Sequence, residues 1–323
     1  MNPLPGDAPP ENPGIIFMGT PEFAVPALEA LIGDGYDIRA VVTQPDRPRG
    51  RGRKTAPSPV KQTAAAHDIP ILQPEKISDE GFLQRIRDSA PDLMIVIAFG
   101  QILKKGLLSV PEWGAINIHA SLLPRYRGAA PIQRAVLHDD SLTGLTVMRM
   151  DEGLDTGPIL YQEEIPILKD ETSGHLHDRL AVVAGDVILR FMKLFRKNRF
   201  KEQPQDNRIA SYAPKIDKSM CAIDWKKDAR DISALIRALD PLPGAYTNMG
   251  GRKIKLFASS VVEEDFFGGV PGRVLIGPGE SLRVETGKGV VEVREMQHAG
   301  KRRMASGDFL RGFAIPEGTI LGK

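Results

Sequence analysis

The run LMIVIA at residues 93–98 is the clearest indication of fold class in this sequence. Six consecutive apolar residues without polar alternation are typical of a strand that is buried on both faces of a parallel sheet. A second apolar run, IIFMG at residues 15–19, ends in glycine, as such a strand does where the chain turns toward a helix. Further extended segments are predicted at residues 38–43, 71–72, 115–119 and 143–150.

Helical patterns lie between these extended segments, at residues 21–32, 60–67 and 79–88, and a long helix is predicted from Ser173 to Phe195. Strands that alternate with helices in this way predict an α/β fold with a Rossmann-like, doubly wound and mostly parallel sheet. Ligands of such sheets bind beyond the carboxyl ends of the strands. We therefore expect functional residues in the loops after Gly19, Ala98 and Ile118.

The pattern changes in the last third of the chain. Residues 199–214 are polar and have few apolar anchors, which favours a linker between domains. A helix is predicted at 229–239, followed by short extended pieces at 245–248, 253–258, 272–276, 282–286 and 290–296 that are typical of a small OB-like β-barrel. The predicted organisation is a disordered tail at 1–13, a catalytic domain at 14–198, a linker at 199–214 and a barrel domain at 215–323.

Composition limits the classes of protein to which the chain can belong. The chain has 323 residues and one cysteine, Cys221, which excludes an internal disulfide. We find no run of about 20 apolar residues that could span a bilayer, and the Pro-rich N-terminus has no signal-peptide pattern, so we expect a cytoplasmic protein without a membrane partner. Residues 201–323 hold 20 Lys and Arg against 16 Asp and Glu, a mildly basic balance that permits a polyanionic partner.

Two polar patterns carry candidate chemistry. Asn117 and His119 lie two residues apart on a predicted strand, so both side chains face the same side and could donate hydrogen bonds to a developing oxyanion. Asp155 lies between two glycines in the loop DEGLDTG at residues 151–157, where its carboxylate could orient the imidazole and accept a proton. Taken separately, the first pattern also fits a polar strand edge and the second a solvated turn.

The strings NIHASLLPRYRGAAPIQRA at 117–135 and TGLTVMRMDEGLDTGPIL at 143–160 together resemble the folate-dependent formyltransferase family. The resemblance implies that Asn117, His119 and Asp155 are catalytic. It also implies 10-formyltetrahydrofolate as the cosubstrate, bound by the element Ser121, Leu122, Leu123 and Pro124. Ala120 departs from the glycine or proline of many relatives, and because it is also small it does not affect the assignment.

The loop TQPDRPRGRGRK at residues 43–54 carries five basic residues spaced by glycines. Taken by itself, such a charge run is most often a solvated basic loop. It resembles the loop with which the tRNA-formylating members of the family enter an acceptor stem. The resemblance implies that initiator methionyl-tRNA is the partner, that its α-amine receives the formyl group, and that tRNA is contacted by Arg49, Arg51, Arg53 and Lys54. In the last third of the chain, the basic cluster at residues 301–303 fits either phosphate contacts or a solvated strand edge.

Other functions remain as alternatives. A formyltransferase that acts on a nucleotide-linked amino sugar can share the two-domain plan, whereas one that acts on glycinamide ribonucleotide is normally shorter. A non-catalytic tRNA-binding protein would be expected to have lost the three catalytic residues. The absence of the G-x-G-x-x-G pattern disfavours a nucleotide cofactor and a nicotinamide dehydrogenase, and no residue set has the spacing of metal ligands. We expect a monomer that uses no metal.

Overall fold

The computed structural model describes residues 8–49, 54–278 and 281–322. The chain forms two compact units. Unit 1 takes in the chain up to Gly128 together with Thr143–Ile165 and His177–Tyr212, and unit 2 takes in Ala129–Leu142, Pro166–Leu176 and the chain from Ala213 onward. The predicted division at 14–198, 199–214 and 215–323 stays a prediction about independent domains.

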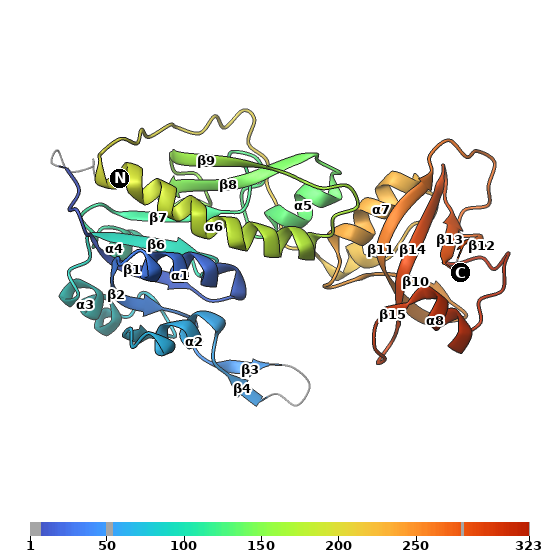
Figure 1. The fold of residues 1–323 in the computed structure, drawn as a ribbon, viewed down its shortest axis with the longest axis horizontal. Helices are drawn as coiled ribbons and strands as arrows, with labels where there is room; N and C mark the ends of the chain where they lie inside the picture. Colours follow the sequence, from blue (N-terminus) through green and yellow to red (C-terminus); the bar gives the residue numbers. More distant parts are fainter. Residues whose placement is uncertain (1–7, 50–53, 279–280, 323) are drawn as a thin grey trace. The chain divides into compact units, whose positions relative to one another are not determined.

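A seven-stranded sheet forms the centre of unit 1 (Figure 1). Its strand order is β5-β2-β1-β6-β7-β8-β9, with parallel pairing from β5 to β7 and antiparallel pairing between β7 and β8. The predicted mostly parallel, Rossmann-like sheet is therefore confirmed. The bounds are β1 (Gly14–Gly19), β2 (Asp37–Val42), β5 (Ile71–Leu72), β6 (Leu93–Ile97), β7 (Ala115–His119), β8 (Leu142–Arg149) and β9 (Ile159–Pro166).

Both faces of this sheet are covered, as the unbroken apolar runs require. Ile15 and Phe17 point to one face and Ile16 and Met18 to the other, and all four side chains have 0% exposure. The helices around the sheet are α1 (Val25–Gly33), which follows the short 3-10 helix η1 (Glu22–Ala24), then α2 (Pro59–Ala66), α3 (Glu80–Asp88), α4 (Lys105–Leu108) and most of α6 (Ser173–Arg196). The chain turns outward in opposite directions from β1 and β6, which makes the edge between these two strands the topological switch point.

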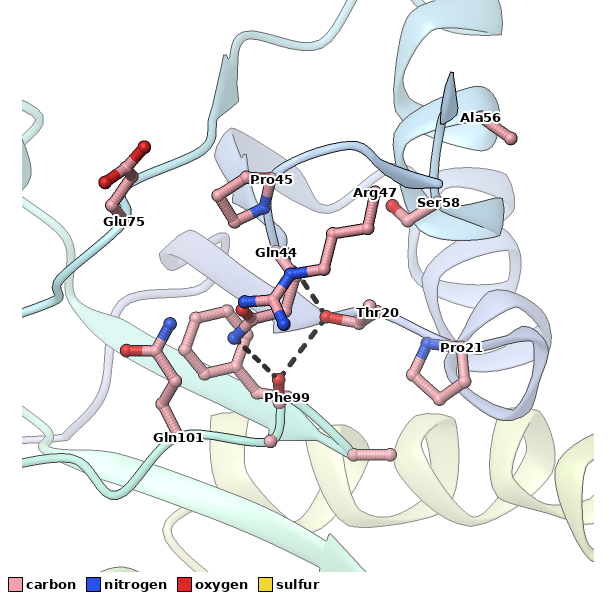
Figure 2. A pocket seen from close by; sticks show the side chains of 12 residues that line it. Thr20, Pro21, Gln44, Pro45, Arg47, Ala56, Ser58, Glu75, Phe99 and Gln101 are labelled. Atoms are coloured by element: carbon pink, nitrogen blue, oxygen red, sulfur yellow. Dashed lines mark hydrogen bonds between the residues drawn. The ribbon is translucent and has the colours of Figure 1, made fainter. Parts of the chain in front are cut away.

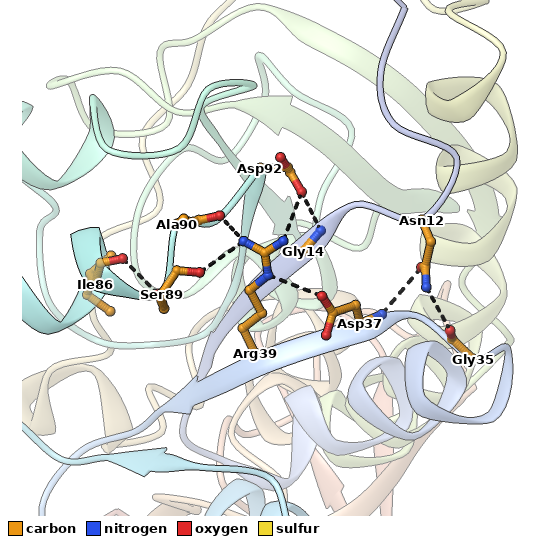
Figure 3. Close-up of polar contacts among 9 residues, drawn as sticks. All are labelled: Asn12, Gly14, Gly35, Asp37, Arg39, Ile86, Ser89, Ala90 and Asp92. Carbon is orange, nitrogen blue, oxygen red and sulfur yellow. Dashed lines mark hydrogen bonds and ion pairs between the residues drawn. The ribbon is translucent and has the colours of Figure 1, made fainter.

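Arg39 fastens the amino ends of the strands (Figure 3). Its guanidinium pairs with Asp37 at 3.1 Å and donates to the carbonyl of Ser89 at 2.9 Å. It also lies 3.6 Å from Asp92, whose carboxylate accepts a 2.6 Å hydrogen bond from the backbone N–H of Gly14. These contacts join β1, β2 and the loop after α3, and they leave the opposite, carboxyl edge of the sheet open for a site.

Unit 2 contains an antiparallel sheet of order β10-β11-β14-β13-β12, with β15 paired to β14. Val274 N–H donates to Thr319 and Leu321 N–H donates to Gly272, while Gly322 N–H donates to Asn248 on β10. The chain end thus bonds to both edges of the sheet and closes it into a barrel, in agreement with the predicted OB-like class. The strands are β10 (Ala245–Met249), β11 (Arg252–Glu263), β12 (Val274–Ile276), β13 (Leu282–Glu285), β14 (Val290–His298) and β15 (Met304–Ala305).

Helices complete unit 2. The helix predicted at 229–239 is α7 (Ala229–Ala238), which packs against α5 (Pro131–Leu137) and against β11. The short elements η2 (Lys218–Cys221) and α8 (Ser306–Gly312) were not predicted. Across the parts of the chain that the structure describes, we find no helix that is both long enough and apolar enough to cross a membrane. The cytoplasmic location stays a prediction.

Candidate active site

Strand β7 carries two of the candidate catalytic residues at its carboxyl end. Asn117 and His119 point to one face of the sheet, while Ile118 between them is buried on the other. His119 Nε2 lies 2.8 Å from the carbonyl oxygen of Tyr126. A carbonyl can only accept, so Nε2 carries the proton and Nδ1 is the nitrogen that faces away from this bond. The hydrogen bond at Nε2 therefore fixes the orientation of the imidazole and leaves Nδ1 on the opposite side of the ring.

Asp155 approaches the free side of this imidazole. Its Oδ2 lies 3.7 Å from His119 Nδ1, and the two side chains are 15% and 7% exposed. The same oxygen accepts a 2.8 Å hydrogen bond from the backbone N–H of Gly128. A separation of 3.7 Å is longer than a direct hydrogen bond, so the carboxylate faces the ring without being bonded to it. The structure thus brings His119 and Asp155 together in a nearly buried setting.

The loop that carries Asp155 needs glycine at position 157. Asp155 itself has φ +54°, in the left-handed region that Asp tolerates better than most residues. A Cβ added at Gly157 would lie 1.8 Å from the carbonyl oxygen of Arg149, so only glycine lets the loop pass this close to the end of β8. The spacing of DEGLDTG therefore reflects a close backbone approach that aims Asp155 at His119.

Asn117 differs from its neighbours in its hydrogen bonding. Its side chain is partly exposed, and within the described ranges of the chain its amide makes no hydrogen bond. The other polar residue on this face, His119, is buried and bonded. An unbonded amide beside a held imidazole leaves donors available for a bound molecule.

The element Ser121, Leu122, Leu123 and Pro124 follows β7 directly. Ser121 is fully buried and its hydroxyl donates to the carbonyl of Arg125, and Leu123 is buried in a small core cluster with Met148 and Ile159. Leu122 and Pro124 are only partly buried. Contact between this element and a folate stays a prediction, and the two partly exposed side chains are the ones available for it.

A pocket of ≈ 500 Å³ opens at the carboxyl ends of β1, β2 and β6 (Figure 2). The carbonyl of Phe99 accepts from the Thr20 hydroxyl at 3.4 Å and from Gln44 Nε2 at 3.2 Å, which fixes the inner wall. Asn117 is paired with Val96 on β6, so the pocket and the catalytic candidates share one edge of the sheet. The loops after Gly19 and Ala98 were expected here. Gln44 and Arg47 belong to the basic loop at 43–54, which was interpreted as a tRNA contact, and Gln101 was not singled out from the sequence.

The basic loop is carried by a two-stranded hairpin. Strands β3 (Arg47–Arg49) and β4 (Lys54–Ala56) pair antiparallel, with Arg49 opposite Lys54, while Arg51 and Arg53 lie outside the described residues. The tRNA contacts of all four residues stay predictions.

The base of this hairpin is held by Asp46. Its carboxylate bonds Lys61 Nζ at 2.6 Å and Gln73 Nε2 at 2.8 Å. The hydrogen bonds from Lys61 and Gln73 hold the pKa of Asp46 below its ordinary value. Asp46 therefore stays ionised and anchors the hairpin to α2 and to the segment after β5.

Of the basic cluster at 301–303 in unit 2, Arg303 has a structural partner. Its guanidinium donates at 2.5 Å to Asp240, whose side chain is 3% exposed, and it also pairs with Glu295. Arg303 therefore neutralises a buried carboxylate of its own unit. In the described part of the chain no group of three or more His, Cys, Asp and Glu side chains is arranged to hold a metal ion.

The chain can be compared with known proteins. Residues 14–192 match the formyl transferase family, and residues 215–314 match the formyl transferase C-terminal domain. A protein of Syntrophus aciditrophicus named methionyl-tRNA formyltransferase is 47% identical over 308 residues, which cover 95% of this chain and 98% of the relative. The corresponding protein of Pelotomaculum thermopropionicum is 46% identical over 309 residues, which cover 96% and 98%.

A solved structure has the same fold at low sequence identity. WlaRD, described as a sugar 3N-formyl transferase in the presence of dTDP and 5-N-formyl-THF, superposes with a TM-score of 0.65 at 21% identity, over 90% of this chain and 98% of WlaRD. The family that the motifs at 117–135 and 143–160 suggested is confirmed by the matches along nearly the whole chain. This chain belongs to the formyl transferase family.

Proposed function

We propose that this chain transfers the formyl group of 10-formyltetrahydrofolate to the α-amine of methionine carried on initiator tRNA. The observation that carries the proposal is the approach of Asp155 to His119 at 3.7 Å, at the end of the strand that also carries Asn117. The names of the Syntrophus and Pelotomaculum relatives support this acceptor. The formyl-THF present with WlaRD supports a folate as the donor.

In the proposed reaction the methionyl amine attacks the formyl carbon on N10 of the folate. A tetrahedral intermediate forms and its oxygen carries the negative charge. The amide of Asn117 and the protonated imidazole of His119 donate hydrogen bonds to that oxygen, and loss of one such donor typically costs about 10²–10³ in rate. Nε2 already donates to the carbonyl of Tyr126, so in the protonated imidazole the second N–H, at Nδ1, is the one that can donate to this oxygen.

Asp155 has two roles in this scheme. Its charge stabilises the protonated imidazole, and it helps the proton of the attacking amine to reach N10 of the folate. The bond between the formyl carbon and N10 then breaks, and the products are N-formylmethionyl-tRNA and tetrahydrofolate. We propose that the pocket at Thr20, Gln44 and Phe99 receives part of one substrate beside this centre.

The hairpin of β3 and β4 is proposed to present the basic loop to the acceptor stem. Arg49 and Lys54 face each other at the end of the paired strands, Arg51 and Arg53 lie between them in sequence, and Asp46 and Lys61 hold the base of the hairpin. Contacts with phosphates release counterions, so binding of tRNA is expected to weaken steeply as salt concentration rises.

A direct assay tests the proposal. Purified protein is given 10-formyltetrahydrofolate with a labelled formyl group and either initiator or elongator methionyl-tRNA. We expect label on the initiator species and little on the elongator species. Label on a nucleotide-linked amino sugar instead, or on no acceptor while the folate is bound, would refute the proposed acceptor.

A further inference from the structure

The segment expected to be a linker is bound to unit 1 beside the candidate active site. We call residues 202–211 the strap. Gln203 and Ile159 exchange two backbone hydrogen bonds, at 2.9 and 2.8 Å. Glu202 pairs at 2.7 Å with Arg149, whose side chain is 8% exposed. The strap is therefore fastened at the ends of β8 and β9, next to the loop that carries Asp155.

Gln205 of the strap holds that loop directly. Its Nε2 donates to the carbonyl of Asp155 at 2.8 Å and to the carbonyl of Gly157 at 2.7 Å. Its Oε1 accepts from Nε of Arg127 at 2.9 Å. A glutamine amide is suited to this position because it donates twice and accepts once while adding no charge beside the Asp155 carboxylate.

The strap also reaches the residue that orients His119. The hydroxyl of Ser211 accepts a 2.8 Å hydrogen bond from the backbone N–H of Tyr126. The carbonyl of the same Tyr126 is the partner of His119 Nε2, also at 2.8 Å. The Ser211 carbonyl accepts from Arg127 N–H at 2.8 Å. The strap therefore contacts the main chain on both sides of the His119–Asp155 pair.

We infer that Gln205 is a positioning residue for formyl transfer, which sets the separation between Asp155 and His119 by holding the carbonyls of Asp155 and Gly157. The inference rests on the proposed function. Asp155 has few other restraints, since its loop is partly exposed and its carboxylate bonds only Gly128 among the described contacts. Without the Gln205 amide, the loop still passes close to Arg149 at Gly157. It loses the two hydrogen bonds that fix the orientation of Asp155.

Two substitutions separate the bonds of Gln205. Gln205→Met has nearly the same length and removes all three hydrogen bonds, whereas Gln205→Glu keeps an acceptor for Arg127 and removes both donated bonds. The matched control is Asn207→Ala. Asn207 lies on the same strap and accepts a 2.9 Å hydrogen bond from Arg127 Nη2, and its removal leaves the bonds to the Asp155 loop in place. Thermal unfolding of each variant verifies that it is folded.

We expect both Gln205 variants to lower kcat about 10- to 100-fold, because a displacement of about 1 Å at a reacting group costs up to about 10² in rate. KM for tRNA and for folate should change less than about threefold, because the substrates are not contacted. In the Asp155→Asn background the Gln205→Met change should have almost no further effect on kcat, because Gln205 acts through Asp155. The Asn207→Ala control should retain kcat.

Additive losses in the double variant, or a kcat of Gln205→Met equal to that of the control, would overturn the inference. Hydrogen exchange of the peptide covering residues 151–157 provides a test that does not depend on activity. We expect faster exchange in Gln205→Met than in Asn207→Ala. If the unmodified chain formylates no acceptor, the proposed function fails. Equal hydrogen exchange in Gln205→Met and Asn207→Ala would separately contradict the claim that Gln205 positions the loop.

Discussion

Replacing Gly157 by alanine is the sharpest test of how the loop that carries Asp155 is built. The new Cβ would lie 1.8 Å from the carbonyl oxygen of Arg149 and 2.9 Å from its carbonyl carbon. Real Cβ contacts essentially never fall below 3.0 Å, so the loop and the end of β8 must separate by about 1.2 Å. Both partners are main chain, and a rotamer change cannot relieve the contact.

This displacement acts two residues from Asp155. A misplacement of about 1 Å at a catalytic group costs up to about 10² in rate. If Asp155 has the proposed role, kcat of Gly157→Ala is therefore expected to fall about 100-fold. Overpacking of this kind costs about 1–3 kcal/mol of stability, so Tm should fall by several degrees. The loss of kcat should exceed what the fraction of unfolded protein explains at the assay temperature.

Gly106→Ala in α4 is the control for the same chemical change. Nothing lies within 4 Å of a Cβ added there, and alanine favours a helix by about 0.5–1 kcal/mol over glycine. Both variants are assayed for formyl transfer to methionyl-tRNA and for Tm. A Gly157→Ala protein whose kcat and Tm match those of Gly106→Ala would refute the argument that this glycine is required by the close backbone approach.

Three further outcomes are expected. Asp155→Asn keeps an acceptor for its backbone partner but loses the charge, so kcat should fall at least about 10²-fold while Tm is unchanged; near-normal turnover in a single-turnover assay would contradict its role. Ser58→Ala removes the cap of α2 and leaves the buried Thr43 hydroxyl without its 2.7 Å partner, which should cost about 2 kcal/mol in urea unfolding. Burial raises the pKa of Glu285, but hydrogen bonds from Arg273 and a backbone N–H lower it more, to below its ordinary value. The stabilisation is present above the unfolded pKa of about 4.3 and is lost as pH falls through the folded pKa, so Glu285→Gln should lower the urea midpoint at pH 7 and the difference should shrink in acid.

Local pattern was sufficient for the elements with a strong hydrophobic signal. The strands at 15–19 and 93–98 and the helix at 229–239 were predicted to within a residue or two, since each buries a regular apolar face or run. Strand β9 was missed because ILYQEEIP mixes polar and apolar residues without a clear period. The β3–β4 hairpin was missed for a similar reason, since its strands are three residues long and mostly basic or small.

For the site, the spacing of Asn117 and His119 on one strand predicts that they share a face, because the period of a strand is two residues. The resemblance of the surrounding motifs added Asp155 to them. The distance of 3.7 Å between Asp155 and His119 could not be predicted from their positions in the sequence. It depends on the path of the loop after β8, which passes close to Arg149 at Gly157.

The polar composition of residues 199–214 predicted a linker because the segment has few apolar anchors. In the folded chain the strap binds through main-chain hydrogen bonds and the amide of Gln205, and such contacts leave no hydrophobic period in a sequence. The hydrophobic pattern of a sequence indicates which side chains become buried. Here it predicted the sheet, the barrel and the buried faces of their elements. Which polar groups meet across the chain depends on backbone geometry between distant segments, and only the tertiary structure settled that.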